Sequence, residues 1–430
     1  MSVRISPDHE RAARTLLRDR SRARVLVAMS PQQPDALVGA VIAVAAESEI
    51  ELELIVADLT GAFGFLDASG VEAVIKGELR ITSIAGAIPR LLSDYVDHVP
   101  TSLWDVDRSI ASGAFAIDIV LARVAAGSTN EDVSLGSMIG YMPSALSTSA
   151  SVGFEVVESG PRGAHAPFDI PIDRATALVR AENPTTESET AKRAPSPEHR
   201  RIGNQVATLI PDGATIQFGL GAVPTAVIGA LHDKRDLGVH SGIMAAPLLE
   251  LMDSGVISGA EKSRDRGIHV ATGVLAANLP ASRWGASLRL APVSETHSPT
   301  TLLGHDRLWA VNSAFEIDLT GQVNAEYAGA FRIASGGGQT DFMRAAHVSE
   351  GGGAILAITS RTKHGESRIR QFTEPHVRVT LSGNDVDFVV TEFGVAQLRD
   401  RSADERRSAL ISVAHPRDRP NLAHGKGRIP

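Results

Sequence analysis

Short apolar runs alternate with longer Ala- and Leu-rich stretches along most of the chain. Near the N-terminus, RVLVAM (24–29) and ELELIVAD (51–58) predict strands, and DALVGAVIAVAAE (35–47) between them predicts a helix. The same alternation returns in the second half, with strands predicted at 214–219, 237–240, 267–274, 308–313, 353–360 and 386–392, and helices at 224–233 and 246–255. This order predicts an α/β fold of two related open domains, each built on a doubly wound parallel sheet.

One polar segment separates the two halves. The stretch ENPTTESETAKRAPSPEHRR (182–201) is rich in Pro, Ser and Thr and has almost no bulky apolar residue to bury. The 430 residues, 43% of them hydrophobic, are also more than one core usually organises. We therefore predict a first domain at 1–185, a linker at 186–200 and a second domain at 201–430.

Composition narrows the function classes. The 42 Lys and Arg against 50 Asp and Glu give a net charge of -8 without long runs of one sign, which argues against nucleic acid as a partner. No stretch reaches the roughly 18 apolar residues of a membrane span, so no membrane partner and a cytoplasmic location are expected. With 0 cysteines there is neither a thiolate nucleophile nor a Cys-ligated metal, and the 14 histidines lack HExxH spacing, so no metal is predicted.

A Gly-rich turn is the first candidate for chemistry. The stretch IQFGLGAVPTAVIGALHD places Gly219 and Gly221 between a predicted strand and a helix, where backbone N–H groups can approach an anion or a developing oxyanion. The same pattern also fits an ordinary tight turn. Pro224 replaces the third glycine of the dinucleotide fingerprint, and the next predicted strand ends in His240–Ser241 without an acid, which argues against a Rossmann dehydrogenase.

Polar residues crowd the predicted strand ends of the second half. In AVNSAFEIDLTGQVNAE (310–326) a strand ends at Asn312, and Glu316 follows it; ASGGGQTDF (334–342) holds three adjacent glycines. In VVTEFGVAQLRDRSADERRSALISVAHP (389–416), Glu392 follows a strand and SADE (402–405) begins a helix through a capping box. Ligands of α/β sheets bind at such strand ends, although any one of these residues alone also fits a structural role.

Together these motifs resemble the acetyl-CoA hydrolase/transferase family, which includes 4-hydroxybutyrate, acetate and succinate CoA-transferases. The resemblance runs from about residue 20 to about residue 424. It is specific in VNSAFEIDLTGQVNAE, GGQTDF, VVTEFGVAQLR and SVAHP, and weaker in the first half, where AAGSTNED replaces the usual Pro- and Asp-containing loop. It implies two CoA-transferase-type domains, a homo-oligomer, and an enzyme of the acyl-CoA transferase or hydrolase class with coenzyme A thioesters as substrates.

The resemblance also assigns roles to individual positions. Residues expected to contact CoA or an oxyanion are Gly219, Leu220, Gly221, Ala222, Val223, Asn312, Gly336, Gly337 and Gly338. The substrate pocket is expected to include Gln217, Gly242 and Gln339, and Glu392 resembles a glutamate that assists in the active site.

The family nucleophile is missing. In this family the strand after the Gly-rich turn carries a His/Tyr–Ser/Thr–Glu triplet whose glutamate attacks the thioester, and here the triplet reads His240–Ser241–Gly242. A second acid, usual four residues later, is Ala246, and Pro247 follows it. Because glycine has no side chain, CoA transfer through a glutamyl-CoA intermediate at this position is chemically impossible.

Three functions remain open. Water or another small acceptor can attack the thioester directly, with Glu392, His240 or Glu316 as the base, Glu392 being favoured; Glu295 and His297 are more distant candidates. A relocated nucleophile such as Glu250 is a second possibility, although it lies roughly 10 Å along a helix from residue 242. A protein that binds acyl-CoA without turnover, as a sensor or an inactive partner, is the third.

Overall fold

The computed structural model describes residues 8–59, 61, 63–157, 168–181, 194–275 and 287–424, and they form two compact units. Unit 1 comprises Met1–Ser188, Ala271–Glu295 and Phe331–Gly337, and unit 2 comprises Glu189–Val270, Thr296–Ala330 and Gly338–Pro430. Among the described residues, none of the helices has the length and apolar character needed to cross a bilayer.

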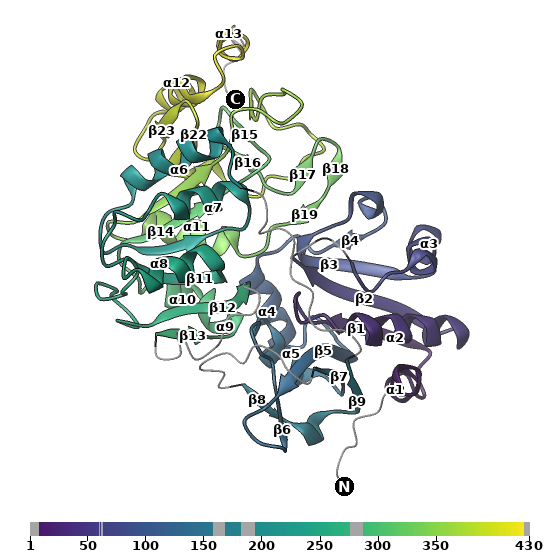
Figure 1. The fold of residues 1–430 in the computed structure, drawn as a ribbon. Coiled ribbons are helices and arrows are strands. Elements are labelled where there is room, and N and C mark those ends of the chain that lie inside the picture. Colours follow the sequence, from purple (N-terminus) through teal and green to yellow (C-terminus); the bar gives the residue numbers. More distant parts are fainter. Residues whose placement is uncertain are drawn as a thin grey trace. The chain divides into compact units, whose positions relative to one another are not determined.

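Unit 1 is built on a sheet whose parallel strands run in the order β3-β2-β1-β5-β7-β9 (Figure 1). This is a doubly wound order, and the helices follow its strands along the chain. The strands are β1 (Arg22–Val27), β2 (Glu51–Asp58), β3 (Arg80–Ala87), β4 (Asp97–His98), β5 (Ile119–Ala126), β6 (Asp132–Ser134), β7 (Ser151–Val157), β8 (Asp169–Pro171), β9 (Ala177–Arg180) and β19 (Ala334–Ser335). The helices are α1 (His9–Leu16), α2 (Asp35–Glu47), α3 (Ala68–Lys76), η1 (Arg90–Leu92), α4 (Leu103–Ala111), α5 (Met142–Thr148) and η2 (Ile172–Arg174).

Unit 2 repeats this arrangement with the order β11-β10-β14-β20-β22, closed by the antiparallel β23. Its strands are β10 (Thr215–Phe218), β11 (Gly238–Ala245), β14 (Leu308–Asn312), β15 (Glu316–Asp318), β16 (Val323–Asn324), β17 (Tyr327–Ala328), β20 (Gly353–Ala357), β21 (Ile369–Arg370), β22 (Phe388–Thr391) and β23 (Gly394–Gln397), whereas β18 (Phe331–Arg332) belongs to unit 1. Its helices are α6 (Pro197–Leu209), α7 (Ala222–Gly229), α8 (Ala246–Asp253), α10 (Pro299–Leu302), α11 (Gln339–Val348), η5 (Gly383–Asp385), α12 (Ala403–Val413) and α13 (Arg419–His424). The remaining elements are β12 (His269–Leu275), β13 (Leu288–Leu290) and α9 (Val293–Thr296).

The cores follow from the apolar runs. In unit 1, Val38 and Val41 of α2 pack with Val25 and Val27 of β1 in one buried cluster. Both faces of these parallel strands are covered, which is why the sequence there reads as continuous apolar runs and not as an alternation. The predicted fold class, two open doubly wound α/β domains, is confirmed.

The boundaries differ from the prediction in two respects. The expected linker ends in a helix, because Ser196 accepts from the backbone N–H of His199 and starts α6 at Pro197; residues 182–193 lie outside the described residues. The predicted second domain also loses two segments to unit 1. The segment 331–337 joins it because β19 pairs with β3, and 271–295 joins it because the N–H of Ile139 bonds to the carbonyl of Thr272.

A third difference concerns the strand that carries residue 242. The sequence predicted a strand ending at His240, but β11 continues to Ala245, so Gly242 lies within the strand. The continuation is physically reasonable because Met244 is fully buried and completes the apolar face of β11.

The predicted capping box at 402–405 is confirmed, since Ser402 and Glu405 exchange hydrogen bonds at the start of α12.

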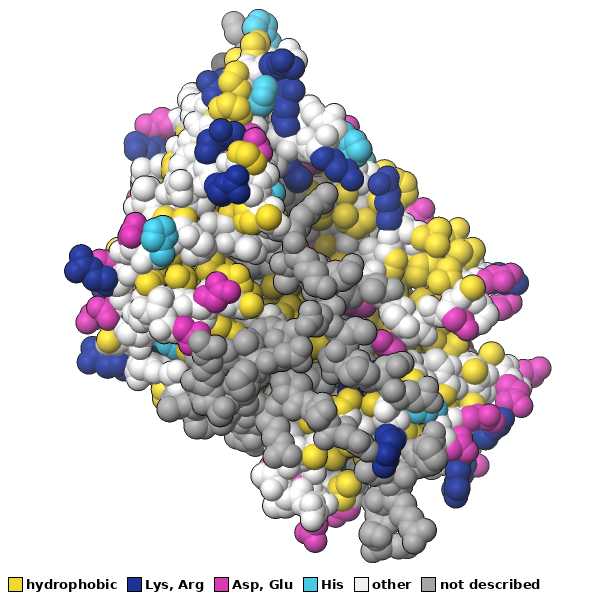
Figure 2. Space-filling model, in the orientation of Figure 1, with side chains coloured by type: hydrophobic (Ala, Val, Ile, Leu, Met, Phe, Trp, Pro, Cys, Tyr) yellow, Lys and Arg dark blue, Asp and Glu magenta, His cyan; other side chains and the backbone are white. Residues whose placement is uncertain are grey.

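The end of unit 2 formed by α12 and α13 is rich in arginine. Figure 2 shows dark blue side chains gathered there, at the top of the view. Two arginines of these helices are tied back to the chain, since Arg407 donates to the carbonyl of Leu422 and Arg419 to that of Ala414. The basic end is thus a local feature of a chain whose net charge is negative.

Candidate active site

The Gly-rich turn lies at the point where the strand order of unit 2 reverses. Strand β10 stands between β11 and β14, and the turn that follows it leads into α7. Gly221 is the N-cap of α7 with φ 121°, a conformation that favours glycine, and no side chain caps this helix. The first N–H groups of α7 are therefore left for another acceptor, at the place where doubly wound sheets bind ligands.

Two amide side chains hold the floor of this turn. Asn312 at the end of β14 donates through Nδ2 to Oε1 of Gln217 at 2.8 Å, and Gln217 returns a longer bond of 3.4 Å to Oδ1. Both side chains are buried. A Cβ on Gly219 would lie 2.8 Å from Oδ1 of Asn312, so only glycine fits at residue 219 beside this pair.

Gly242 faces an imidazole. A Cβ built on Gly242 would lie 3.3 Å from Nε2 and 3.4 Å from Cε1 of His297, and 3.9 Å from Cε2 of Phe342. The same Nε2 lies 2.4 Å from the point where a Cβ would stand on Gly338. Two glycines, both partly exposed, therefore lie over one buried ring, and this ring is the side chain next to the position where the family resemblance expects a carboxylate.

His297 is held in place and kept uncharged. Its Nδ1 is 2.8 Å from the hydroxyl of Thr296, and its ring meets Phe342 edge-on at a centroid distance of 4.9 Å. Burial, and next the neighbouring His240, lower the pKa of His297 to about 3. At neutral pH the ring is neutral, so it can orient a water or a substrate group by hydrogen bonding.

His240 is bound to segments outside the Gly-rich turn. The ring is fully buried, its Nε2 is 2.9 Å from the carbonyl oxygen of Thr296, and it lies tilted against the ring of His305 at a centroid distance of 4.4 Å. Because a carbonyl oxygen only accepts, Nε2 carries the proton. His240 thus fixes the segment that carries His297.

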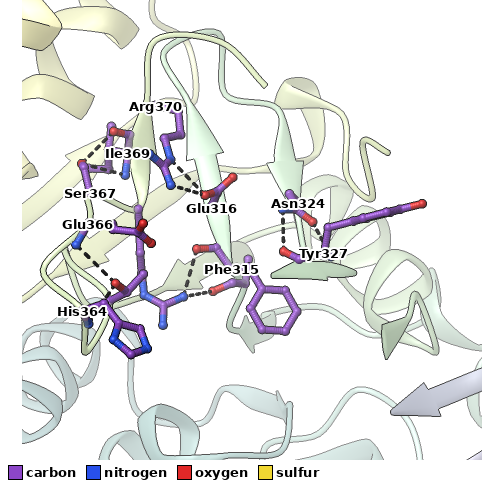
Figure 3. A network of polar contacts seen from close by, with 12 residues as sticks. Phe315, Glu316, Asn324, Tyr327, His364, Glu366, Ser367, Ile369 and Arg370 are labelled. Atoms are coloured by element: carbon purple, nitrogen blue, oxygen red, sulfur yellow. Dashed lines mark hydrogen bonds and ion pairs between the residues drawn. The ribbon is translucent and has the colours of Figure 1, made fainter. Parts of the chain in front are cut away.

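Glu316 belongs to a separate small sheet formed by β15, β16 and β21. Figure 3 shows its carboxylate facing Arg370, which donates to Oε1 from Nε at 2.9 Å and from Nη2 at 2.6 Å. Nearby, Arg368 donates to the carbonyls of Ala314 and Phe315. Glu316 is therefore one half of an ion pair that ties β15 to β21.

Glu392 directly follows β22 and is also held by its neighbours. Its Oε2 accepts from the backbone N–H of Ser360 at 2.8 Å, and its Oε1 from the hydroxyl of the same serine at 2.5 Å. In the sheet, β22 is separated from β14 by β20 alone, and from β11 by β20, β14 and β10. The strand before Glu392 is therefore closer in the sheet to the strand of Asn312 than to the strand of Gly242.

The remaining predicted residues are dispersed. Gln339 at the start of α11 donates to the carbonyl of Ser313, beside Asn312. Gly336 and Gly337 belong to unit 1, whereas Gly338 belongs to unit 2 and contacts His297 as described. Leu220 is exposed at 40%, and Glu250 lies exposed on α8, directed away from the buried side of that helix.

A further grouping in unit 2 was not expected. One ligand atom each from His240, Asp265 and His305 lie within 4.8 Å of one another. The sequence predicted no metal site because no histidine pair has a short metal-binding spacing. These three residues come from separate segments, so no spacing rule could have brought them together.

Comparison with known proteins places this geometry in context. Residues 283–425 match the model of the acetyl-CoA hydrolase/transferase C-terminal domain. The chain is 33% identical over 337 residues to the 4-hydroxybutyrate coenzyme A transferase of Clostridium kluyveri, covering 77% of each chain. It is 31% identical to the succinyl-CoA:cyclohexane-1-carboxylate CoA transferase of Geobacter metallireducens, covering 83% of this chain and 78% of the relative. The protein belongs to the acetyl-CoA hydrolase/transferase family.

Solved structures agree with this membership. RipA from Yersinia pestis superposes with a TM-score of 0.82 at 27% identity, over 96% of this chain and 95% of that one. A 4-hydroxybutyrate CoA-transferase from Porphyromonas gingivalis superposes with a TM-score of 0.76 at 25% identity, over 98% and 96%. The relatives include acetyl-CoA hydrolases of two yeasts, so the expected enzyme class, acyl-CoA transferase or hydrolase, is confirmed for the family that includes this chain.

Within this family member, the predicted site residues divide into two groups. The structure brings together Gln217, Gly219 and Asn312 at the Gly-rich turn, and Gly242 with Gly338 around His297. It does not bring Glu316 or His240 to the turn, because each is bound elsewhere. Sequence reasoning treated His297 as a distant candidate, and the adjacent Thr-His pair carried no signal that its ring would lie beside residue 242.

Proposed function

We propose that this family member transfers the acyl group of an acyl-CoA directly to water or another small acceptor, without a glutamyl-CoA intermediate. In this reaction the acceptor oxygen or nitrogen attacks the thioester carbonyl while a base takes its proton, the C–S bond breaks, and the base passes that proton to the CoA thiolate as it leaves. In this proposal the backbone N–H groups of the turn 219–223 donate hydrogen bonds to the thioester carbonyl oxygen as it gains negative charge.

The observation that carries the proposal is the environment of residue 242. No carboxylate stands there, and the group beside it is the neutral ring of His297, whose pKa is lowered by burial. A neutral imidazole cannot form the acyl anhydride that a carboxylate forms, but its ring nitrogen can orient an incoming acceptor. Because residue 242 has no side chain, nothing at this position stands between an acceptor and the ring of His297.

Glu392 is the proposed base. Ser360 fixes both oxygens of its carboxylate, and β22 is two strand positions from β14, about 10 Å at about 4.8 Å per strand. A substrate held over β10 and β14 would thus lie between Glu392 and His297. The proposal gives proton removal to Glu392 and acceptor orientation to His297.

A second candidate function is acyl-CoA binding without turnover. It is favoured by one observation, that the carboxylates of Glu316 and Glu392 both already have strong partners, Arg370 and Ser360. A binding protein of this kind would keep the Gly-rich turn and lose the chemistry.

The experiment that separates these functions follows the CoA pool. The protein is incubated with a panel of acyl-CoA thioesters, alone and with acetate, succinate and simple amines, and the products are resolved by chromatography and mass. The absence of cysteine means that the protein adds no thiol of its own. Release of free CoA supports direct acyl transfer. If the His297→Ala and Glu392→Gln variants no longer release CoA, the activity belongs to this protein and not to a contaminating thioesterase.

The other outcomes reject the proposal in distinct ways. A new acyl-CoA formed with a carboxylate acceptor would mean CoA transfer through a relocated nucleophile. An unchanged pool together with measurable acyl-CoA binding would establish the binding function. The cytoplasmic location and the homo-oligomer expected from the sequence stay predictions, and light scattering of the purified protein tests the second.

A further inference from the structure

His305 is a buried titratable side chain with no role in the proposed acyl transfer. It is 1% exposed, and within the described part of the chain neither Nδ1 nor Nε2 has a hydrogen-bond partner. A neutral imidazole carries one N–H donor and one nitrogen acceptor, and in water both would be hydrogen-bonded. Buried polar atoms in native proteins are nearly always paired, and one that is not calls for an explanation such as an ion.

Two further donor groups converge on this ring. The ligand atoms of His240, Asp265 and His305 all lie within 4.8 Å of one another, with both histidines buried and the aspartate half-buried. These residues come from β11, from the turn before β12 and from the turn before β14, so all three belong to unit 2. Bonds of about 2.0–2.2 Å to one ion hold ligand atoms roughly 3–4 Å apart, so small side-chain rotations suffice.

The protonation states suit ligation. Because Nε2 of His240 donates to the carbonyl oxygen of Thr296 at 2.9 Å, its Nδ1 carries the lone pair. This is the usual arrangement behind a metal-bound histidine, in which the outer ring nitrogen is fixed by a carbonyl.

We propose that His240, Asp265 and His305 form a binding site for one divalent transition-metal ion of the Zn²⁺ type. Two imidazoles and one carboxylate are the ligands of Zn²⁺ and its neighbours, whereas Mg²⁺ and Ca²⁺ prefer oxygen alone. The ion would join β11 to the two turns and fix the strand that carries Gly242. This proposal is independent of whether the protein turns over acyl-CoA.

The surrounding charges set the strength of the site. Lys262 is buried with its ammonium group on the carbonyls of Val239 at 3.1 Å and Ile268 at 2.5 Å, and Arg264 packs beside Gly304. These two cations oppose a metal ion, and Asp265 compensates part of that repulsion. We therefore expect binding that a strong chelator reverses.

The test uses the full-length protein without an affinity tag, since a histidine tag binds the same ions. The chelated protein is titrated with Co²⁺ and Zn²⁺, with Co²⁺ followed by the visible absorption that nitrogen ligation produces and Zn²⁺ by equilibrium dialysis and elemental analysis. About one equivalent per chain is expected, with a rise in Tm on addition of Zn²⁺. Absence of both the absorption and a bound equivalent would overturn the proposal.

Variants separate this site from other histidines. Asp265→Asn should lose the bound equivalent while folding normally, because Asp265 has φ 48°, where asparagine is well tolerated. The control is His269→Asn, which removes a buried histidine whose Nδ1 accepts from the N–H of Val239 and which should keep the equivalent. Undiminished binding in Asp265→Asn, or equal loss in His269→Asn, counts against the assignment.

His305→Leu provides a second readout that does not depend on detecting metal. If the site binds no ion, leucine removes two buried unpaired nitrogens and should leave Tm unchanged or raise it. If the site binds an ion, the variant should lose the Zn²⁺-dependent rise in Tm that the native protein shows. A rise that persists in His305→Leu would overturn the proposal.

Discussion

Nε2 of His297 lies 3.3 Å from the point where a Cβ would stand on Gly242. Real Cβ contacts are rarely this short, so any side chain at residue 242 requires the ring to move by a few tenths of an ångström. The ring has little freedom, because Thr296 holds Nδ1 and the ring of Phe342 meets it edge-on. A side chain at residue 242 and the present position of the His297 ring therefore exclude one another.

This crowding predicts the outcome of placing a glutamate at residue 242. Gly242→Glu alone should destabilise the protein by about 1–3 kcal/mol, the usual cost of overpacking, and should not form acetyl-CoA from another acyl-CoA and acetate. In a double-mutant cycle with His297→Ala, the two changes should couple favourably, because the space vacated by the ring accepts the new side chain. Denaturant unfolding measures the coupling, and Gly242→Gln with His297→Ala is the control without a nucleophile. Purely additive effects would show that the ring does not exclude a side chain there.

Glu392 provides the second prediction. Glu392→Gln keeps the shape of the side chain and removes its basicity, so turnover should fall by something like 10²–10⁴-fold while acyl-CoA affinity changes little. Ser360→Ala is the companion variant, because it removes the hydroxyl that orients the carboxylate at 2.5 Å and leaves the carboxylate itself. It should reduce turnover less than Glu392→Gln. Unchanged turnover in Glu392→Gln would show that Glu392 is not the base, and His297 would then be the next residue to test.

The Gly-rich turn provides the third prediction. In Gly219→Ala the new methyl would stand 2.8 Å from Oδ1 of Asn312, so the pair between Asn312 and Gln217 must separate. Turnover and acyl-CoA affinity should each fall by roughly tenfold or more, because the amide pair supports the proposed oxyanion contacts. Gly229→Ala is the matched control, since a Cβ there meets nothing within 4 Å. Equal effects of the two substitutions would contradict a special role for the turn.

The sequence predicted the fold well and the site only in part. The helix at 35–47 and the strand at 51–58 appear with those bounds, since each is a long apolar run with clear ends. The pairing of Gln217 with Asn312 follows from the strand order, because polar residues at adjoining strand ends meet. The positions of His297 and His305 were not predictable, because each depends on how a segment without regular periodicity packs beneath β11.

Asp107 in unit 1 provides the last prediction, on stability against pH. Its carboxyl is 1% exposed on α4, and burial raises its pKa to about 6, an effect that a hydrogen bond to Ser144 only partly offsets. Between about pH 4 and 6 the folded chain holds a proton that the unfolded chain has released, so this group lowers stability as pH rises through that window. A pKa raised by about two units lowers the free energy of unfolding by at most about 3 kcal/mol above pH 6.

Asp107→Asn should therefore stabilise the protein at pH 8 by up to that amount and have little effect at pH 4, as measured by urea unfolding. Asp105→Asn, on the same helix but exposed, should change stability by less than about 0.5 kcal/mol at both pH values. A stabilisation of Asp107→Asn that is equal at pH 4 and pH 8 would mean that the carboxyl does not titrate in this window.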